Sequence, residues 1–190
     1  VVTFPPWVGI TLHAAPMQAG GASLDWLARL LGQKAADLAQ GAAEITATSP
    51  LFLPHLQGER APFWDAALRG TFAGLSGATG PAELTAAVLE GVAFSARLSL
   101  EALQRSGAVQ PATVRLGGGG AASDRWCQIR ADALNIPLAR MVGKDPGAMG
   151  AAVMAGVGSG ALPDLATAAE RLVRVERTFT PDPAKAQLAN

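Results

Sequence analysis

The sequence has one cysteine, no long apolar run and no excess of charge of either sign. Cys127 has no partner for a disulfide within the chain, which fits a reducing, cytoplasmic setting. The 15 basic and 15 acidic residues balance, so nothing favours binding to nucleic acid or to an anionic membrane surface. No apolar run reaches the roughly 18 residues that a bilayer-spanning helix needs. A basic segment followed by an apolar one, as in a secretion signal, is also missing.

The length and the first residue limit what the chain can be. At 190 residues it fits one domain of ordinary size with a substantial core. It begins with Val1 rather than methionine, so we expect a fragment of a longer protein.

Segments with strand and helix patterns alternate along the chain. Strands are expected at residues 8–12, 51–53, 70–75, 113–116 and 137–142. Helices are expected at residues 24–31, 33–45, 81–105, 124–134, 147–158 and 164–173. Ser23 is predicted to cap the first helix, and the polar tail from Pro181 is expected to be frayed. The alternation predicts an α/β domain with a mixed sheet.

Two of the expected helices have unusual compositions. In helix 81–105 the charged residues fall on one narrow stripe, so we expect its other faces to pack against a sheet. Helix 147–158 contains only Gly, Ala, Met and Val. Its lack of bulk predicts a very close approach to a neighbouring element.

The run of four glycines from Gly117 to Gly120 is the most informative feature. It follows the expected strand 113–116 and leads into the expected helix 124–134. Glycines let a flat or charged ligand approach the backbone, and the helix start offers unpaired N–H groups at a positive dipole end. The pattern therefore predicts a nucleotide-binding turn.

Two simpler interpretations of this run are open. It could be a tight turn that needs positive φ angles and nothing else. It could also be a dinucleotide fingerprint, because Gly117-x-Gly119-x-x-Ala122 fits G-x-G-x-x-A. That motif calls for an acidic residue at the end of the next strand, about 20 residues later. Asp145 lies somewhat too far along for that role.

A third interpretation uses two glycine turns. Gly20 and Gly21 precede one helix, as Gly119 and Gly120 precede another, and Asp25 and Asp124 lie in the first turns of these helices. Facing each other, the two turns would form a cleft for a purine and its ribose, and a side chain at Gly120 would obstruct the adenine. The aspartates could accept hydrogen bonds from an exocyclic amine or from ribose hydroxyls. Acids at helix starts are favourable without a ligand too, so both explanations stand.

Five segments in order resemble the FGGY carbohydrate kinases. One run similar to the family's C-terminal signature is Gly70-Thr71-Phe72-Ala73-Gly74-Leu75 followed by Glu83 to Glu90, and the segment Leu53 to Asp65 resembles the one preceding it. The runs Ala19 to Leu27 and Gly118 to Asp124 are similar to the two adenosine-contacting loops. The run Gly147 to Ala152 resembles the small-residue helix that follows.

The resemblance implies an actin-like, ribonuclease-H-like ATPase fold, with a mixed sheet flanked by helices, over residues 1–190. ATP would bind in a cleft against a sister domain, with Mg²⁺ held mainly through the phosphates and the missing half. The implied nucleotide-binding residues are, on one side, Gly20, Gly21 and Asp25, and on the other Gly118, Gly119, Gly120, Ala121 and Asp124. No catalytic residue and no metal ligand is assigned within this chain.

In this family a separate N-terminal domain binds most of the sugar and carries the general base. Neither that domain nor a Gly-Thr-Ser phosphate turn is present here, so we expect the chain alone to bind adenine nucleotide weakly without kinase activity. The full kinase could be a homodimer. Gly58 to Pro62 and Trp64-Asp65 are most similar to xylulokinases. Gluconate and other pentulose kinases share much of that segment, which leaves the sugar open.

Other functions compete with this one. A non-enzymatic actin-like module that binds nucleotide, or a dinucleotide-binding oxidoreductase, would also use glycine turns. Glu59 and Asp65 could form a glycosidase carboxylate pair. Because Arg60 and Arg69 flank them, we expect ion-paired scaffolding instead.

Overall fold

The computed structural model describes residues 1–6, 9–143 and 145–188. The helices are α1 (Gly21–Leu31), α2 (Ala35–Gly41), α3 (Pro81–Arg105), α4 (Asp124–Leu134), α5 (Pro146–Gly158), α6 (Leu165–Leu172) and α7 (Pro183–Leu188), with a short 3₁₀ turn at Gly119–Ala121. The strands are β1 (Val2–Thr3), β2 (His13–Ala14), β3 (Leu51–Leu53), β4 (Thr71–Ala73), β5 (Val114–Leu116), β6 (Leu138–Met141) and β7 (Val175–Phe179).

The strands of the described residues form three small sheets. β1 pairs with β2 and β3 pairs with β4, both antiparallel. In the third sheet β5 and β6 run parallel, and β7 joins β6 antiparallel. This sheet is mixed, as the sequence predicts, and α4 is the crossover between its parallel strands.

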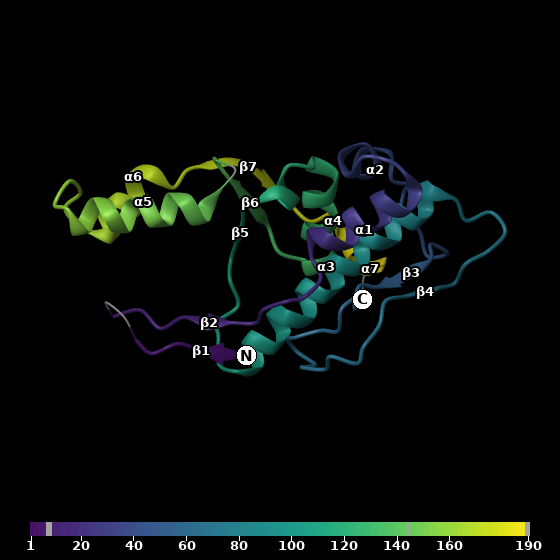
Figure 1. The fold of residues 1–190 in the computed structure, drawn as a ribbon, viewed down its shortest axis with the longest axis horizontal. Helices are drawn as coiled ribbons and strands as arrows, with labels where there is room; N and C mark the ends of the chain where they lie inside the picture. Colours follow the sequence, from purple (N-terminus) through teal and green to yellow (C-terminus); the bar gives the residue numbers. More distant parts are fainter. Residues whose placement is uncertain (7–8, 144, 189–190) are drawn as a thin grey trace.

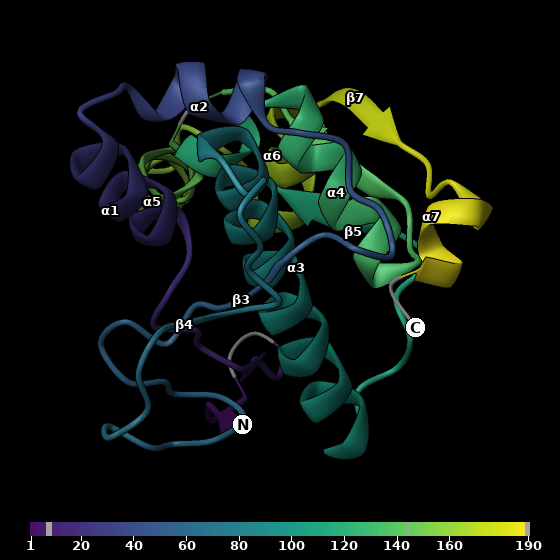
Figure 2. The same ribbon diagram turned by 90° about the vertical axis from the view of Figure 1, so that its right-hand side faces the viewer.

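Helix α3 runs through the centre of the body (Figures 1 and 2). Its packing differs from the prediction: it lies against helices α1, α2 and α4 and strand β3 rather than against a broad sheet. Val88 and Leu89 are fully buried in the core cluster that these elements share. Gly91 is required here, because a Cβ at this position would lie 2.1 Å from the carbonyl oxygen of Phe52 in β3.

Several predictions about ends of elements are wrong. The first strand was expected at residues 8–12, of which Val8 lies outside the described residues. The structure instead places β2 at His13–Ala14, paired with β1. Ser23 does not cap α1, because Gly20 holds the cap position and Ser23 is buried inside the helix. The hydroxyl of Ser23 thus lies in the core.

The C-terminal tail as far as Leu188 is ordered rather than frayed. β7, which the sequence pattern did not predict, adds to the sheet, and α7 packs on α4. The Asp182 N–H donates to the Asp132 carboxylate at 2.8 Å, and Ala186 is buried. The tail is therefore part of the fold.

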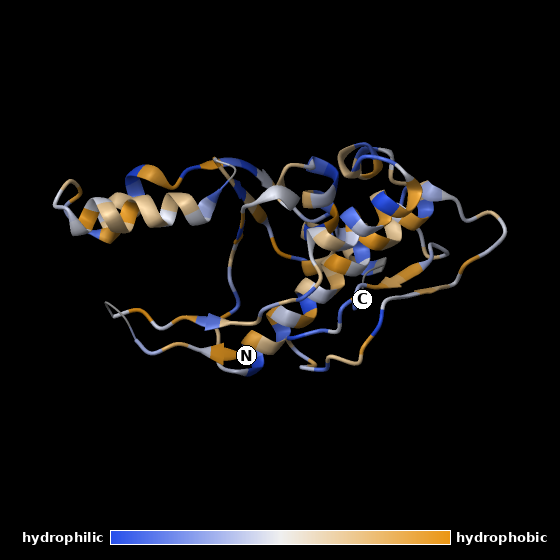
Figure 3. Cartoon of the chain, in the orientation of Figure 1, coloured by the Kyte–Doolittle hydropathy of each residue, from blue (hydrophilic) through white to orange (hydrophobic). Residues whose placement is uncertain are grey.

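Helices α5 and α6 extend away from the body as an arm (Figure 1) and carry much apolar surface (Figure 3). Within the described residues, only Val153 of α5 is buried, and positions Gly150 and Gly158 have open space where a Cβ would stand. The close approach predicted for this helix is wrong except at Gly156, where a Cβ would lie 2.7 Å from Leu162. Among the described helices none has the length and apolarity to cross a membrane.

Candidate nucleotide-binding site

The first glycine turn leads directly into α1. The Ser23 N–H donates to the Gly20 carbonyl at 3.1 Å, and a Cβ at Gly21 would face open space. Asp25 is exposed, and within the described part of the chain its carboxylate has no hydrogen-bond partner. It lines a pocket of about 390 Å³ together with Arg29 and neighbouring polar residues. The carboxylate of Asp25 is thus available to a ligand.

The second turn joins β5 to α4. Gly118 adopts φ of 83°, a conformation that favours glycine, and its carbonyl accepts from the Ala121 N–H at 3.0 Å. Ser123 caps α4 by accepting from the Trp126 N–H at 3.2 Å. Strand, glycine turn and helix start follow one another as the sequence predicts.

Asp124 differs from Asp25 because its carboxylate is already bonded. One oxygen accepts from Arg140 Nη1 of β6 at 2.6 Å, and the other accepts from Arg177 Nη1 of β7. Arg140 also contacts Glu176 at 3.1 Å. These bonds tie the start of α4 to the sheet, so Asp124 has a structural role whether or not it meets a ligand.

A pocket of about 560 Å³ lies between α2 and the start of α4. Its lining residues are Leu24, Ala35, Ala36, Ala39, Gln40, Ala122, Ser123, Asp124, Arg125 and Trp126. Leu24 of α1 therefore lies at the same pocket as the start of α4, and α1 and α4 share one core. The two aspartates line different pockets, with Asp25 outside this one.

Sequence reasoning missed the alanine wall of this pocket. Ala35, Ala36 and Ala39 lie on one side of α2, a spacing that places them on one helical face. Small side chains leave a flat, apolar surface that suits a planar ring, and Ser123 and Asp124 supply polar groups opposite it. The pocket has the shape and chemistry to take a heterocyclic base.

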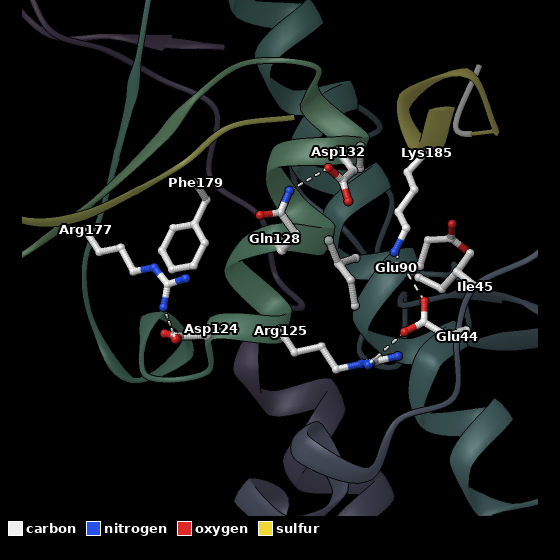
Figure 4. A pocket seen from close by; sticks show the side chains of 12 residues that line it. Glu44, Ile45, Glu90, Asp124, Arg125, Gln128, Asp132, Arg177, Phe179 and Lys185 are labelled. Carbon is white, nitrogen blue, oxygen red and sulfur yellow. Dashed lines mark hydrogen bonds and ion pairs between the residues drawn. The ribbon is translucent and has the colours of Figure 1, made fainter. Parts of the chain in front are cut away.

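Another pocket, of about 370 Å³, is lined by α4 with residues of α3, β7 and α7, and it shares Asp124 and Arg125 with the pocket between α2 and α4 (Figure 4). On its wall Glu44 bonds Lys185 and Arg125, and the Lys185 ammonium chiefly holds the pKa of Glu44 below its usual range. Glu90 of α3 also lines it, and burial raises the pKa of Glu90 to about 6. Most charged side chains in this pocket already form ion pairs with one another. It is therefore a weaker candidate for a nucleotide site than the pocket between α2 and α4.

Glu59 does not pair with the flanking arginines as predicted. Its carboxylate is buried, lies 3.2 Å from His55 Nδ1 and accepts from the N–H groups of Gln18 and Arg60 at 2.6 and 2.9 Å. Asp65 accepts from the Ala67 N–H at 2.7 Å. The two carboxylates thus have separate structural partners, and Glu59 fixes the segment that enters α1.

The strand–helix–strand unit β5–α4–β6 has the parallel geometry that a dinucleotide fingerprint requires. The acidic residue does not follow, because Asp145 caps α5 by accepting from the Ala148 N–H at 2.9 Å. In the described residues no group of three or more His, Cys, Asp or Glu side chains could hold a metal ion.

Comparison with known proteins decides the family. Residues 6–159 match the model of the C-terminal domain of the FGGY family of carbohydrate kinases. The chain belongs to the FGGY family of carbohydrate kinases.

Individual relatives agree with the family match. A xylulose kinase of Bacillus subtilis is 35% identical over 92% of this chain, and a glycerol kinase of Aromatoleum aromaticum is 38% identical over 85%. The crystal structure of ligand-bound xylulose kinase from Lactobacillus acidophilus superposes with a TM-score of 0.79 at 29% identity, over 92% of this chain. The fold is therefore the actin-like, ribonuclease-H-like ATPase fold that the sequence predicts. The chain spans only 34%, 33% and 36% of these three proteins, respectively.

Proposed function

We propose that this chain is the nucleotide-binding half of an ATP-dependent carbohydrate kinase, which transfers the γ-phosphate of ATP to a sugar hydroxyl. Membership of the FGGY family is the observation that carries the proposal. The pocket between α2 and α4 supports it, since its alanine wall lies opposite Ser123 and Asp124 at the helix start that follows the second glycine turn. The reducing, cytoplasmic setting expected for such a kinase agrees with the buried free thiol of Cys127.

In this proposal the adenine lies against the alanine wall of α2, and the ribose lies toward the two turns. Gly20, Gly21 and Asp25 contact the nucleotide from the start of α1, where Asp25 lines a separate pocket and offers its free carboxylate to a ribose hydroxyl. Gly118, Gly119, Gly120 and Ala121 contact it through their backbone, while Asp124 acts mainly by anchoring α4.

Magnesium accompanies ATP in phosphoryl transfer. The described residues contain no metal-binding cluster. The ion would therefore be bound by the phosphates, by water and by groups outside this chain.

The sugar is proposed to be a pentulose such as xylulose. The segment from Gly58 to Asp65 favours it, and relatives named as xylulose kinases support it. A glycerol kinase is equally similar in sequence, so the acceptor is best tested on the complete protein.

Calorimetric titration of ADP into the chain, with NAD as the control ligand, tests the nucleotide half of the proposal. We expect saturable ADP binding and no NAD binding. NAD preferred over ADP would contradict the proposal. A coupled assay of ADP release from ATP and xylulose should show no sugar-dependent activity for residues 1–190 alone, because the groups that bind and activate the sugar are missing.

A further inference from the structure

Arg130 of α4 is partly buried beside the second glycine turn. No carboxylate of the described residues pairs with it, whereas most other buried charges in proteins have a counter-ion. Burial lowers the pKa of Arg130 to about 10, so the guanidinium is still charged at neutral pH. A charge without a counter-ion in such a place lowers the stability of the fold. We therefore expect the guanidinium to have a function there.

Its two contacts define that task. Arg130 Nη1 donates to the carbonyl oxygen of Gly120 at 2.9 Å. Its guanidinium carbon lies 3.9 Å from the ring centroid of Trp126, one helical turn earlier. Trp126 is itself buried, and its indole N–H donates to the Leu89 carbonyl of α3 at 3.1 Å. Arg130 thus links the glycine turn to the central helix through Trp126.

The space beside Gly120 belongs to this arrangement. A Cβ at residue 120 would lie 2.9 Å from Arg130 Nη2 and 3.5 Å from Trp126 Cζ3. The Gly120 φ angle is not among the positive ones, so backbone strain does not require a glycine here. A side chain at residue 120 would contact Arg130 and Trp126. From the sequence this glycine is explained by the space that adenine needs, whereas the structure shows that the space is beside the guanidinium of Arg130.

We propose that Arg130 is a positioning residue of the nucleotide site, which fixes the Gly120 carbonyl and the Trp126 ring so that the second turn keeps its shape for the ligand. The inference rests on the proposed function for its ligand. A guanidinium suits the task because one planar group stacks on the ring and donates in its plane. In this proposal a side chain at residue 120 would push the end of that group away from the turn.

A double-mutant cycle of Gly120→Ala and Arg130→Ala, read by ADP titration, tests the proposal. Each single variant is expected to weaken ADP binding roughly tenfold, the effect of losing one charge-assisted hydrogen bond. Gly120→Ala should add less than about twofold once Arg130 is absent, because the obstructed group is gone. Arg171→Ala, on the exposed face of α6, is the matched control and should leave the affinity unchanged. Equal weakening by Gly120→Ala in both backgrounds would overturn the inference and leave the proposed function intact.

A second readout does not depend on nucleotide. The indole N–H resonance of Trp126, assigned with Trp126→Phe, should shift in Gly120→Ala, and should shift less when Gly120→Ala is introduced into the Arg130→Ala variant. If the parent chain fails to bind ADP, the proposed function fails for this chain, and the resonance alone decides the role of Arg130. An indole resonance that shifts in neither Gly120→Ala nor Arg130→Ala would refute that role. Where Arg130→Ala does not fold, Arg130→Met replaces it because it keeps most of the side-chain volume.

Discussion

The two glycine turns look alike in sequence but differ in how their side chains are used. After Gly20 and Gly21 the carboxylate of Asp25 is free among the described residues, and a Cβ at Gly21 would meet nothing. After the second turn, Asp124 is bonded to two arginines and Gly120 is closely surrounded. The comparison teaches that Asp25 is free to meet a ligand, whereas Asp124 and Gly120 are held by the side chains packed around them.

Replacing Trp126 should break the second turn with the largest effect. Trp126→Ala removes a buried ring and its hydrogen bond to Leu89, so we expect a loss of about 3–5 kcal/mol in the free energy of unfolding. Trp26→Ala, beside the first turn, should cost only about 2 kcal/mol because that ring is partly exposed. Urea denaturation of both variants measures the difference. Equal losses would contradict the idea that the ring beside the second turn is the more deeply buried of the two.

Glu90, on the far side of α4, provides a pH test of the same region. Burial raises the pKa of Glu90 from 4.5 to about 6 in the folded protein, so folding favours the protonated acid. Its stabilising contribution is complete below pH 4.5 and is lost as the pH rises through 6. Glu90→Gln should therefore be more stable than the parent by about 1 kcal/mol at pH 8, after allowance for solvent screening, and equally stable near pH 4.

Thermal unfolding of the parent and Glu90→Gln across that pH range gives the result. Glu170→Gln, an exposed residue of α6, is the control and should show no such trend. A stability difference that does not change with pH would rule out the buried carboxyl as its cause.

Removing Asp124 should mainly affect stability, whereas removing Asp25 should mainly affect nucleotide binding. Asp124→Ala should lower the free energy of unfolding by about 0.5–1 kcal/mol, because a largely exposed pair of ion pairs is lost. Asp25→Ala should leave stability unchanged but weaken ADP binding by roughly fivefold, the effect of one partly exposed hydrogen bond. Urea denaturation and ADP titration of both variants give the comparison. A loss of stability in Asp25→Ala together with weaker ADP binding in Asp124→Ala would contradict the roles assigned to the two residues.

Gly21→Ala should have a small effect on stability. The added methyl faces open space, so the free energy of unfolding should stay within about 0.5 kcal/mol of the parent. ADP binding should nevertheless weaken if the nucleotide lies against the backbone of this turn. ADP titration measures the affinity, and a denaturation curve of the same variant measures its stability. An unchanged affinity would mean that Gly21 is not part of the proposed site.

Much of the fold could be predicted from local pattern. Helix α3 has the bounds predicted, because Pro81 suits its first position and a capping Glu83 contacts the Gly80 N–H at 2.9 Å. Helix α4 does too, since Ser123 and Asp124 favour a helix start. β7 could not be predicted, because four of its five residues are exposed and its place is decided by pairing with β6.

Part of the candidate site could likewise be predicted from local pattern, and part could not. The two glycine turns and their aspartates were visible as motifs, and their roles in nucleotide binding are still proposals. The alanine wall, the arginines that hold Asp124 and the guanidinium behind Gly120 come from segments far apart in the sequence. No local pattern could relate Arg177 to Asp124, because only the sheet brings them together.

The sequence by itself determined the family, the glycine turns and most helices, because these depend on residue type and short-range spacing. The tertiary structure decided which aspartate is free for a ligand and which is held by neighbouring side chains. The physical reason is that a carboxylate or a glycine acquires its role from the charges and volumes packed around it. Those neighbours are chosen by folding, and Asp25 and Asp124 therefore differ although their motifs agree.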